Sequence, residues 1–201
     1  TGLICALILM LILSIINTYS VKWLIKCNNA LTILKFFIPA IIAISIIFYH
    51  NHIPTSTKYI NNFAPTHIHG ILSALSSAGI VFAFNGFKQA AEMAGEAKNP
   101  SKAIPIAIIG SIIACLILFV LLQYAFLASL TPENIKHGWE NLTLHQQNSP
   151  LFSILQQDNL LKLGPALAVT AIIAPLAAGL IYVSSASRSL AGISENGQMP
   201  E

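Results

Sequence analysis

Long runs of apolar residues separated by shorter polar segments make up most of this chain. Five runs have the length and composition of helical membrane spans, and they cover residues of about 3–16, 24–49, 71–95, 104–130 and 165–190. A helix needs about 20 apolar residues to cross the hydrocarbon core of a bilayer. Spanning β-strands would need shorter segments of strictly alternating polarity, which this sequence lacks. The pattern therefore predicts an all-α, polytopic membrane protein that contacts the lipid bilayer.

Composition excludes the main alternatives to a membrane protein. Of the 201 residues, 55% are hydrophobic and 8% are charged, whereas a soluble domain carries about 25% charged residues. Intrinsic disorder requires high charge and low hydrophobicity, so it is excluded as well. The net charge of +3 is small and scattered, which argues against a nucleic-acid partner. The three cysteines show no CxxC spacing, and we predict no metal site and no cofactor.

Basic residues are unevenly divided between the loops. The short segments 18–29, 96–103 and 188–201 hold Lys22, Lys26, Lys98, Lys102 and Arg188, whereas the longer segments 50–70 and 131–164 hold Lys58, Lys136 and Lys162. The positive-inside rule then places the three short segments in the cytoplasm. We expect a multi-pass protein of the plasma (cell inner) membrane.

All histidines fall in the two longer loops, which the same rule places outside the cell. No cysteine or carboxylate cluster accompanies them in the sequence, so we interpret them as solvated loop residues rather than as a pH sensor or metal site. They are His50, His52, His67, His69, His137 and His145.

The third run contains a turn signal inside an apolar helix. Asn85-Gly86 is a dipeptide typical of turns. A helix that opens there leaves carbonyl and N–H groups free to hold a zwitterion or an ion, as in transporters with broken helices. The alternative is close packing, because Gly86, Ala90 and Ala94 recur every four residues and form a small-residue stripe. The two interpretations are compatible.

Two lysines lie within the predicted spans. An ionisable group inside the membrane is a functional hypothesis by default, so Lys35 is a candidate for proton exchange. The alternative is that its side chain snorkels to the interface. Lys88 and Glu92 are spaced for a local helical ion pair, with a gate or proton relay as the alternative. No catalytic motif is present, so we do not expect an enzyme.

The segment 82–108 reads FAFNGFKQAAEMAGEAKNPSKAIPIAI and contains the pattern E-x-x-N-P-x-[RK]-x-I-P-x-A from Glu96 to Ala107. This segment resembles the sixth helix and following loop of amino acid permeases, which show the same pattern. Two further segments are similar to the same family, the amino acid–polyamine–organocation (APC) superfamily. They are 187–200, near the end of the eighth helix, and 17–35, at the junction of the fourth and fifth.

The resemblance implies that the five spans are helices four to eight of about twelve. The fold would then be a partial inverted-repeat transporter fold with a broken third span, and the missing N- and C-terminal helices of the same transporter would be partners. The first residue is not methionine and lies in an apolar run, so we expect a fragment of a longer chain. The implied function is secondary active transport of amino acids or related amines by alternating access, coupled to a proton or a counter-substrate.

The resemblance also assigns roles to individual residues. Positions 80–84 correspond to the helix-six segment whose carbonyls hold the substrate amino group, with Phe82 as an aromatic gate. Lys35 corresponds to a lysine that replaces a sodium ion in proton-coupled relatives. The implied substrate-binding residues are Ile80, Phe82, Ala83, Phe84, Gly86 and Tyr182, and the implied ion-coupling residues are Lys35 and Ser185.

Two positions depart from the family pattern. Lys88 stands where an acidic residue is frequent, and Asn196 replaces the usual aspartate of a D-G element. Two other functions stay open: a permease-fold receptor that senses amino acids, and an unrelated membrane-anchor subunit. An unbroken third helix would favour the anchor, and a large soluble extension in the parent protein would favour the receptor.

Overall fold

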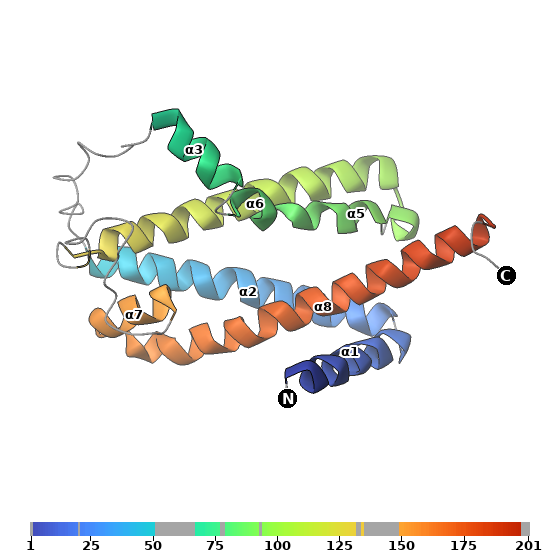
Figure 1. Cartoon of the computed structure of the whole chain (residues 1–201), viewed down its shortest axis with the longest axis horizontal. Helices are drawn as coiled ribbons and strands as arrows, with labels where there is room; N and C mark the ends of the chain where they lie inside the picture. The colour runs from blue at the N-terminus through green and yellow to red at the C-terminus, as the bar shows by residue number, and fades with distance from the viewer. Residues whose placement is uncertain are drawn as a thin grey trace. The chain divides into compact units, whose positions relative to one another are not determined.

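The chain is almost entirely helical in a computed structural model (Figure 1). The structure describes residues 2–19, 21–50, 67–76, 79–92, 94–131, 134 and 149–197. These residues form α-helices joined by short turns and 3-10 segments, and no strand occurs among them. The prediction of an all-α fold is confirmed.

The described residues form four long helices and four short ones in chain order, with 3-10 turns between some of them. The long helices are α1 (Gly2–Tyr19), α2 (Val21–Tyr49), α6 (Pro100–Ser129) and α8 (Gly164–Glu195). The short helices are α3 (His67–Ser76), α4 (Ile80–Ala83), α5 (Lys88–Glu92) and α7 (Pro150–Gln157). The 3-10 turns are η2 (Asn85–Phe87), η3 (Ala94–Glu96) and η5 (Leu161–Leu163).

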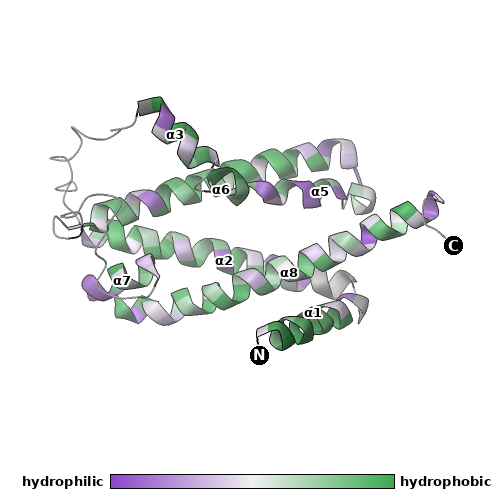
Figure 2. Ribbon diagram, in the orientation of Figure 1, coloured by the Kyte–Doolittle hydropathy of each residue, from purple (hydrophilic) through white to green (hydrophobic). Residues whose placement is uncertain are grey.

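Three of these segments are long and apolar enough to cross a membrane. They are Asn28–Tyr49, Pro100–Ser129 and Leu161–Glu195. A fourth candidate is the bent pair Ile68–Ser76 and Ile80–Glu92, whose two pieces lie at 48° to each other. The apolar stretch Gly2–Asn17 of α1 is shorter than a full span, although Figure 2 shows it as strongly hydrophobic.

The helices extend further than the hydropathy pattern predicts. The predicted loop 18–29 is helical at every described position, and α8 continues to Glu195, inside the segment 188–201 that was expected to be a loop. A helix satisfies its own backbone groups in water as well as in lipid, so polar side chains do not end it. The beginning of α6 does follow a sequence signal, because Pro100 occupies its first position and the Asn99 carbonyl accepts from Ala103 N–H at 2.9 Å.

The chain divides into two compact units. The first comprises residues 1–35, 85–113 and 171–201, and the second comprises residues 36–84 and 114–170. In the first unit, α1 lies against α8, where Leu13 is 8% exposed. The segments that the positive-inside rule assigns to the cytoplasm all belong to the first unit.

The second unit has a hydrophobic core built from three helices. Its fully buried side chains are Ile42, Ala43 and Ile46 of α2, Ala125 of α6, and Ile154 and Leu155 of α7. Burial of large aliphatic side chains from α7 fixes this short helix to the longer ones, since each contributes about 1.5–3 kcal/mol. Figure 1 shows α7 beside the end of α2 and the beginning of α8.

The hydropathy pattern did not predict α7, because this helix is short and lies in a polar stretch. Its start nevertheless carries a clear signal. Ser149 is the N-cap, its Oγ accepts a hydrogen bond from Phe152 N–H at 3.3 Å, and Pro150 occupies the first turn. Ser-Pro before an apolar stretch is therefore the feature that could have revealed this helix.

Candidate functional site

The predicted break in the third span is present, and it has two parts. Asn85–Phe87 forms the 3-10 turn η2 between α4 and α5, at the predicted turn dipeptide. A change of direction of 48° lies upstream, between Ser76 and Ile80. There Gly79 is left-handed with φ 77°, a conformation that favours glycine, and its carbonyl accepts from Ala83 N–H at 3.1 Å. The sequence located the 3-10 turn but not the bend.

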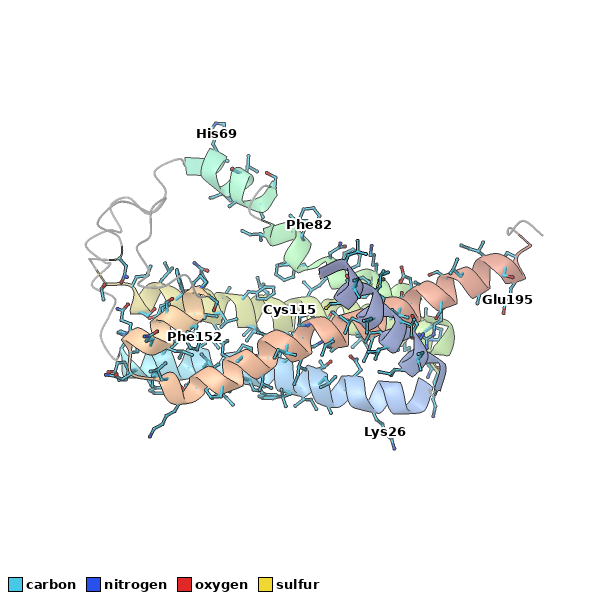
Figure 3. All side chains as sticks on the ribbon, turned by 60° about the horizontal axis from the view of Figure 1, so that its bottom comes forward. Lys26, His69, Phe82, Cys115, Phe152 and Glu195 are labelled. Atoms are coloured by element: carbon cyan, nitrogen blue, oxygen red, sulfur yellow. The ribbon has the colours of Figure 1, made fainter. Side chains whose placement is uncertain are left out.

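The predicted substrate residues of α4 have different surroundings. Phe82, labelled on α4 in Figure 3, is 72% exposed. Phe84, two residues later, is half-buried and packs edge-on against Phe119 of α6, with ring centroids 5.4 Å apart. Ile80 and Ala83 are exposed. Phe84 is therefore anchored within the second unit, whereas Phe82 is free to contact another molecule or segment.

Among the described residues, no neighbouring helix packs closely against Gly86. A Cβ added there would meet no atom within 4 Å, and the same is true of Gly95. Close packing by the small-residue stripe is thus not what requires glycine at this turn. The absence of a side chain leaves the backbone of η2 open, as a site for a ligand at the break requires.

The hydroxyl of Ser185 is the most unusual polar group of α8. Hydroxyls in apolar helices normally bond to a carbonyl of their own helix, as Ser45 and Thr170 do in this chain. Ser185 is 2% exposed, and its Oγ has no hydrogen-bond partner among the described residues. An unsatisfied buried hydroxyl costs about 1–3 kcal/mol. A polar partner for this group is therefore expected in the working protein.

Two other predicted site residues, Tyr182 and Lys35, form no hydrogen bond with Ser185 in the described part of the chain. Tyr182, one turn earlier on α8, is 50% exposed. Lys35 is half-buried on α2 and forms no ion pair with a described residue. Both residues belong to the first unit, as Ser185 does.

Sequence reasoning missed Gln89 as a candidate. Its side chain is 7% exposed on α5, and its Oε1 has no partner in the described part of the chain. Gln89 follows the 3-10 turn by two residues, and a neutral amide at the end of an apolar run was the available signal. A buried amide at this position requires a hydrogen-bonding neighbour for the same reason as Ser185.

The ion pair expected between Lys88 and Glu92 does not form. Both side chains are exposed on α5, and no ion pair joins them. Exposed helical pairs gain about 0.5 kcal/mol at most, which is too little to fix two long side chains.

Asp158 and His50 form an ion pair that the sequence did not predict. Nε2 of His50 lies 2.8 Å from Oδ2 of Asp158, and Asp158 is 3% exposed. The interpretation of His50 as a solvated loop residue was therefore wrong. Burial raises the pKa of the Asp158 carboxyl above its ordinary 3.8, while the hydrogen bond and the charge of His50 oppose this rise. His52, His137 and His145 lie outside the described residues.

Comparison with known proteins identifies relatives over the full chain. Residues 1–201 match the family model described as amino acid permease. A glutamate/serine transporter of Bacillus subtilis (strain 168) is 37% identical over 99% of this chain. An aspartate-proton symporter of the same organism is 31% identical, again over 99% of the chain. A branched-chain amino acid permease from that organism is 36% identical over 47% of the chain and 19% of its own length.

The chain spans little more than a third of the length of the two relatives that align with 99% of it. The aligned part makes up 36% of the glutamate/serine transporter and 38% of the aspartate-proton symporter. No solved structure was found to match the chain.

Proposed function

Because the chain belongs to the amino acid permease family, we propose that it is part of a secondary active transporter that moves amino acids across a membrane by alternating access. The observation that carries this proposal is the similarity of 99% of the chain to two amino acid transporters, at 37% and 31% identity. Family membership and apolar spanning helices make the chain part of an integral multi-pass membrane protein. They also set aside the alternative of an unrelated membrane anchor.

We propose the broken third span as one wall of the substrate site. Helix ends at a break offer backbone groups to the carboxylate and ammonium groups of an amino acid. Three observations support this location: the 3-10 turn η2, the open space around Gly86 and the outward-facing Phe82. Ile80, Ala83 and Phe84 complete the α4 side, and Tyr182 of α8 is the proposed contribution of a second helix.

The proposed substrates are small or acidic amino acids. Two relatives that cover the chain have names that refer to glutamate, serine and aspartate. Gln89 supports a polar substrate, since its buried amide is an additional hydrogen-bonding group close to the turn.

Proton coupling is the proposed energy source, with exchange against a counter-substrate as the second mode. One relative is named as a proton symporter. Lys35 is the proposed carrier of the coupling charge, and the unpartnered hydroxyl of Ser185 is its proposed polar neighbour in the complete protein. A half-buried lysine inside a span can exchange its proton when its surroundings change.

The proposed location is the plasma membrane, with segments 18–29, 96–103 and 188–201 in the cytoplasm. The proposed domain is a single membrane domain with spans at about 3–16, 24–49, 71–95, 104–130 and 165–190. The lysines and the arginine of the three short segments support this orientation.

Uptake by the full-length protein tests the function directly. We would reconstitute it in liposomes and measure entry of labelled glutamate, aspartate, serine and leucine, with protein-free liposomes as the control. We expect saturable uptake of at least one acidic or small amino acid, reduced about tenfold or more by excess unlabelled substrate. Specific binding without uptake would instead identify a receptor, and neither uptake nor binding of any amino acid would overturn the proposal.

A further inference from the structure

His50 and Asp158 connect two segments that are far apart in the chain. His50 follows the last turn of α2, and Asp158 is the C-cap residue of α7. The imidazole is 25% exposed and the carboxylate 3% exposed, with Nε2 and Oδ2 separated by 2.8 Å. Both residues lie outside the spanning segments, which end at Tyr49 and begin at Leu161.

This contact lies at the end of the packing surface of α7. Ile154 and Leu155 bury the helix against Ile42 and Ile46 of α2. The backbone N–H of Asp158 donates to the carbonyl of Ile154 at 2.9 Å, so the carboxylate is held directly to the end of this helix. Separation of α7 from α2 would therefore break the His50–Asp158 contact, and the contact in turn stabilises the docked helix.

Few other titratable groups of the described residues lie near the pair. The ring of Tyr49 meets the His50 ring edge-on, with centroids 5.6 Å apart. On the elements of this unit that pack here, the other described titratable residues are Cys115 and Tyr124 of α6 and Lys162 of η5, while α7 itself carries none. Lys162 is exposed and forms no ion pair with a described residue. Within the described part of the chain, the two members of the pair are thus each other's charged partners.

Protonation decides whether this buried contact is favourable. A histidine in its charged form carries hydrogen on both ring nitrogens, so Nε2–H of His50 donates to Oδ2 of Asp158 and the two charges compensate each other. When that proton leaves, a nearly buried carboxylate faces a neutral ring, which costs free energy.

Burial raises the pKa of Asp158, because a carboxylate removed from water is costly when no opposite charge faces it. The hydrogen bond and the charge of His50 oppose this rise, so the buried carboxylate is stabilised by a protonated partner.

We propose that His50 and Asp158 form a proton-binding site, which fastens α7 to the end of α2 when it holds a proton and loosens the helix when the proton leaves. Docking takes up one proton from solution and undocking returns it. On the orientation proposed above, this site faces the external medium, so external acid would favour the docked state. The site is separate from Lys35, which lies inside a span and in the other unit.

Thiol accessibility on α7 tests this site without any transport measurement. The experiment uses the full-length protein in lipid nanodiscs, with its native cysteines replaced by serine. Ser153 is 7% exposed, so the thiol of Ser153→Cys reacts with maleimide when α7 undocks. Gln156→Cys, at an exposed position of the same helix, corrects for the effect of pH on thiol reactivity. The measured quantity is the ratio of the two maleimide-labelling rates at about pH 5.5 and about pH 8.

We expect this ratio to rise about threefold or more between the lower and the higher pH. His50→Gln and Asp158→Asn should each flatten the pH response, and either variant alone suffices if the other does not fold. His69→Gln is the matched control, because His69 is an exposed histidine of α3 (Figure 3) and should leave the response unchanged. A pH-independent ratio in the parent protein, or an unchanged response in His50→Gln, would overturn the proposal. Neither outcome depends on whether the protein transports amino acids.

Discussion

Phe82 and Phe84 lie two positions apart in the broken third span, but their side chains have different surroundings. Phe84 is held by the ring of Phe119, and an aromatic pair of this kind contributes about 0.5–1.5 kcal/mol beyond the burial of its area. Phe82 has no ring contact with a described residue and is 72% exposed. Phe84 therefore stabilises the fold, whereas Phe82 is exposed and open to the proposed contact with a substrate.

Alanine substitutions should separate these two roles. Phe84→Ala should lower the free energy of unfolding by about 1 kcal/mol or more, seen as a lower Tm of the purified full-length protein. Phe82→Ala should change stability by less than about 0.5 kcal/mol but weaken binding of a labelled amino acid substrate about tenfold. Equal losses of stability, or an unchanged substrate affinity in Phe82→Ala, would contradict this division.

Residue-level prediction from the sequence was possible where a single residue type was informative by itself. Lys35 is conspicuous as a charge inside an apolar run, and Asn85-Gly86 is conspicuous as a turn. The His50–Asp158 pair was missed because its members are 108 positions apart, and no local pattern indicates which side chains meet across such a distance. Gln89 was missed because its burial depends on packing rather than on its neighbours in the sequence.

At the scale of elements, the contact between α1 and α8 depends on the absence of a side chain. A Cβ added at Gly179 would lie 2.9 Å from Cδ1 of Leu13, closer than real side chains approach. The end of the leucine side chain would have to move to make room.

Gly179→Ala should therefore destabilise the protein. We expect a loss of about 1–3 kcal/mol, the usual cost of overpacking, measured by thermal unfolding of the full-length protein. Adding Leu13→Ala should recover part of this loss, because it removes the atom that clashes. Gly192→Ala is the control on the same helix, where an added Cβ meets nothing within 4 Å and alanine favours the helix. If both glycine variants behave alike, the proposed contact is not the cause.

Helix type was predictable from hydropathy, but helix ends were not. The apolar runs indicated the parts of α2, α6 and α8 that are long and apolar enough to cross a membrane, because lipid requires continuous apolar surface. The ends extend into polar sequence, where hydropathy carries no information about helix formation. The short helix α7 depends on tertiary packing by Ile154 and Leu155, which a search for membrane spans does not consider.

At the scale of the whole molecule, the chain matches only part of the length of its relatives. It covers 36% and 38% of two relatives that align along its whole length. Many large apolar side chains of the described helices are exposed, including Phe82, Ile106 and Ile172. Such surface is stable in contact with lipid or with further helices, and transport by alternating access is proposed for the complete protein.

The central claim is that the complete protein moves amino acids with protons and that Lys35 carries the coupling charge. Substrate-dependent proton movement in liposomes containing the full-length protein tests it most directly, with an inward pH gradient and uptake of a labelled acidic or small amino acid. The account predicts uptake above equilibrium, at least about tenfold lower after collapse of the gradient by a protonophore. Lys35→Ala should lose this gradient-driven uptake, and Lys26→Ala, an exposed lysine of the same helix, should keep it. Gradient-driven uptake that survives Lys35→Ala would contradict the role of the lysine, and uptake that ignores the gradient would contradict proton coupling.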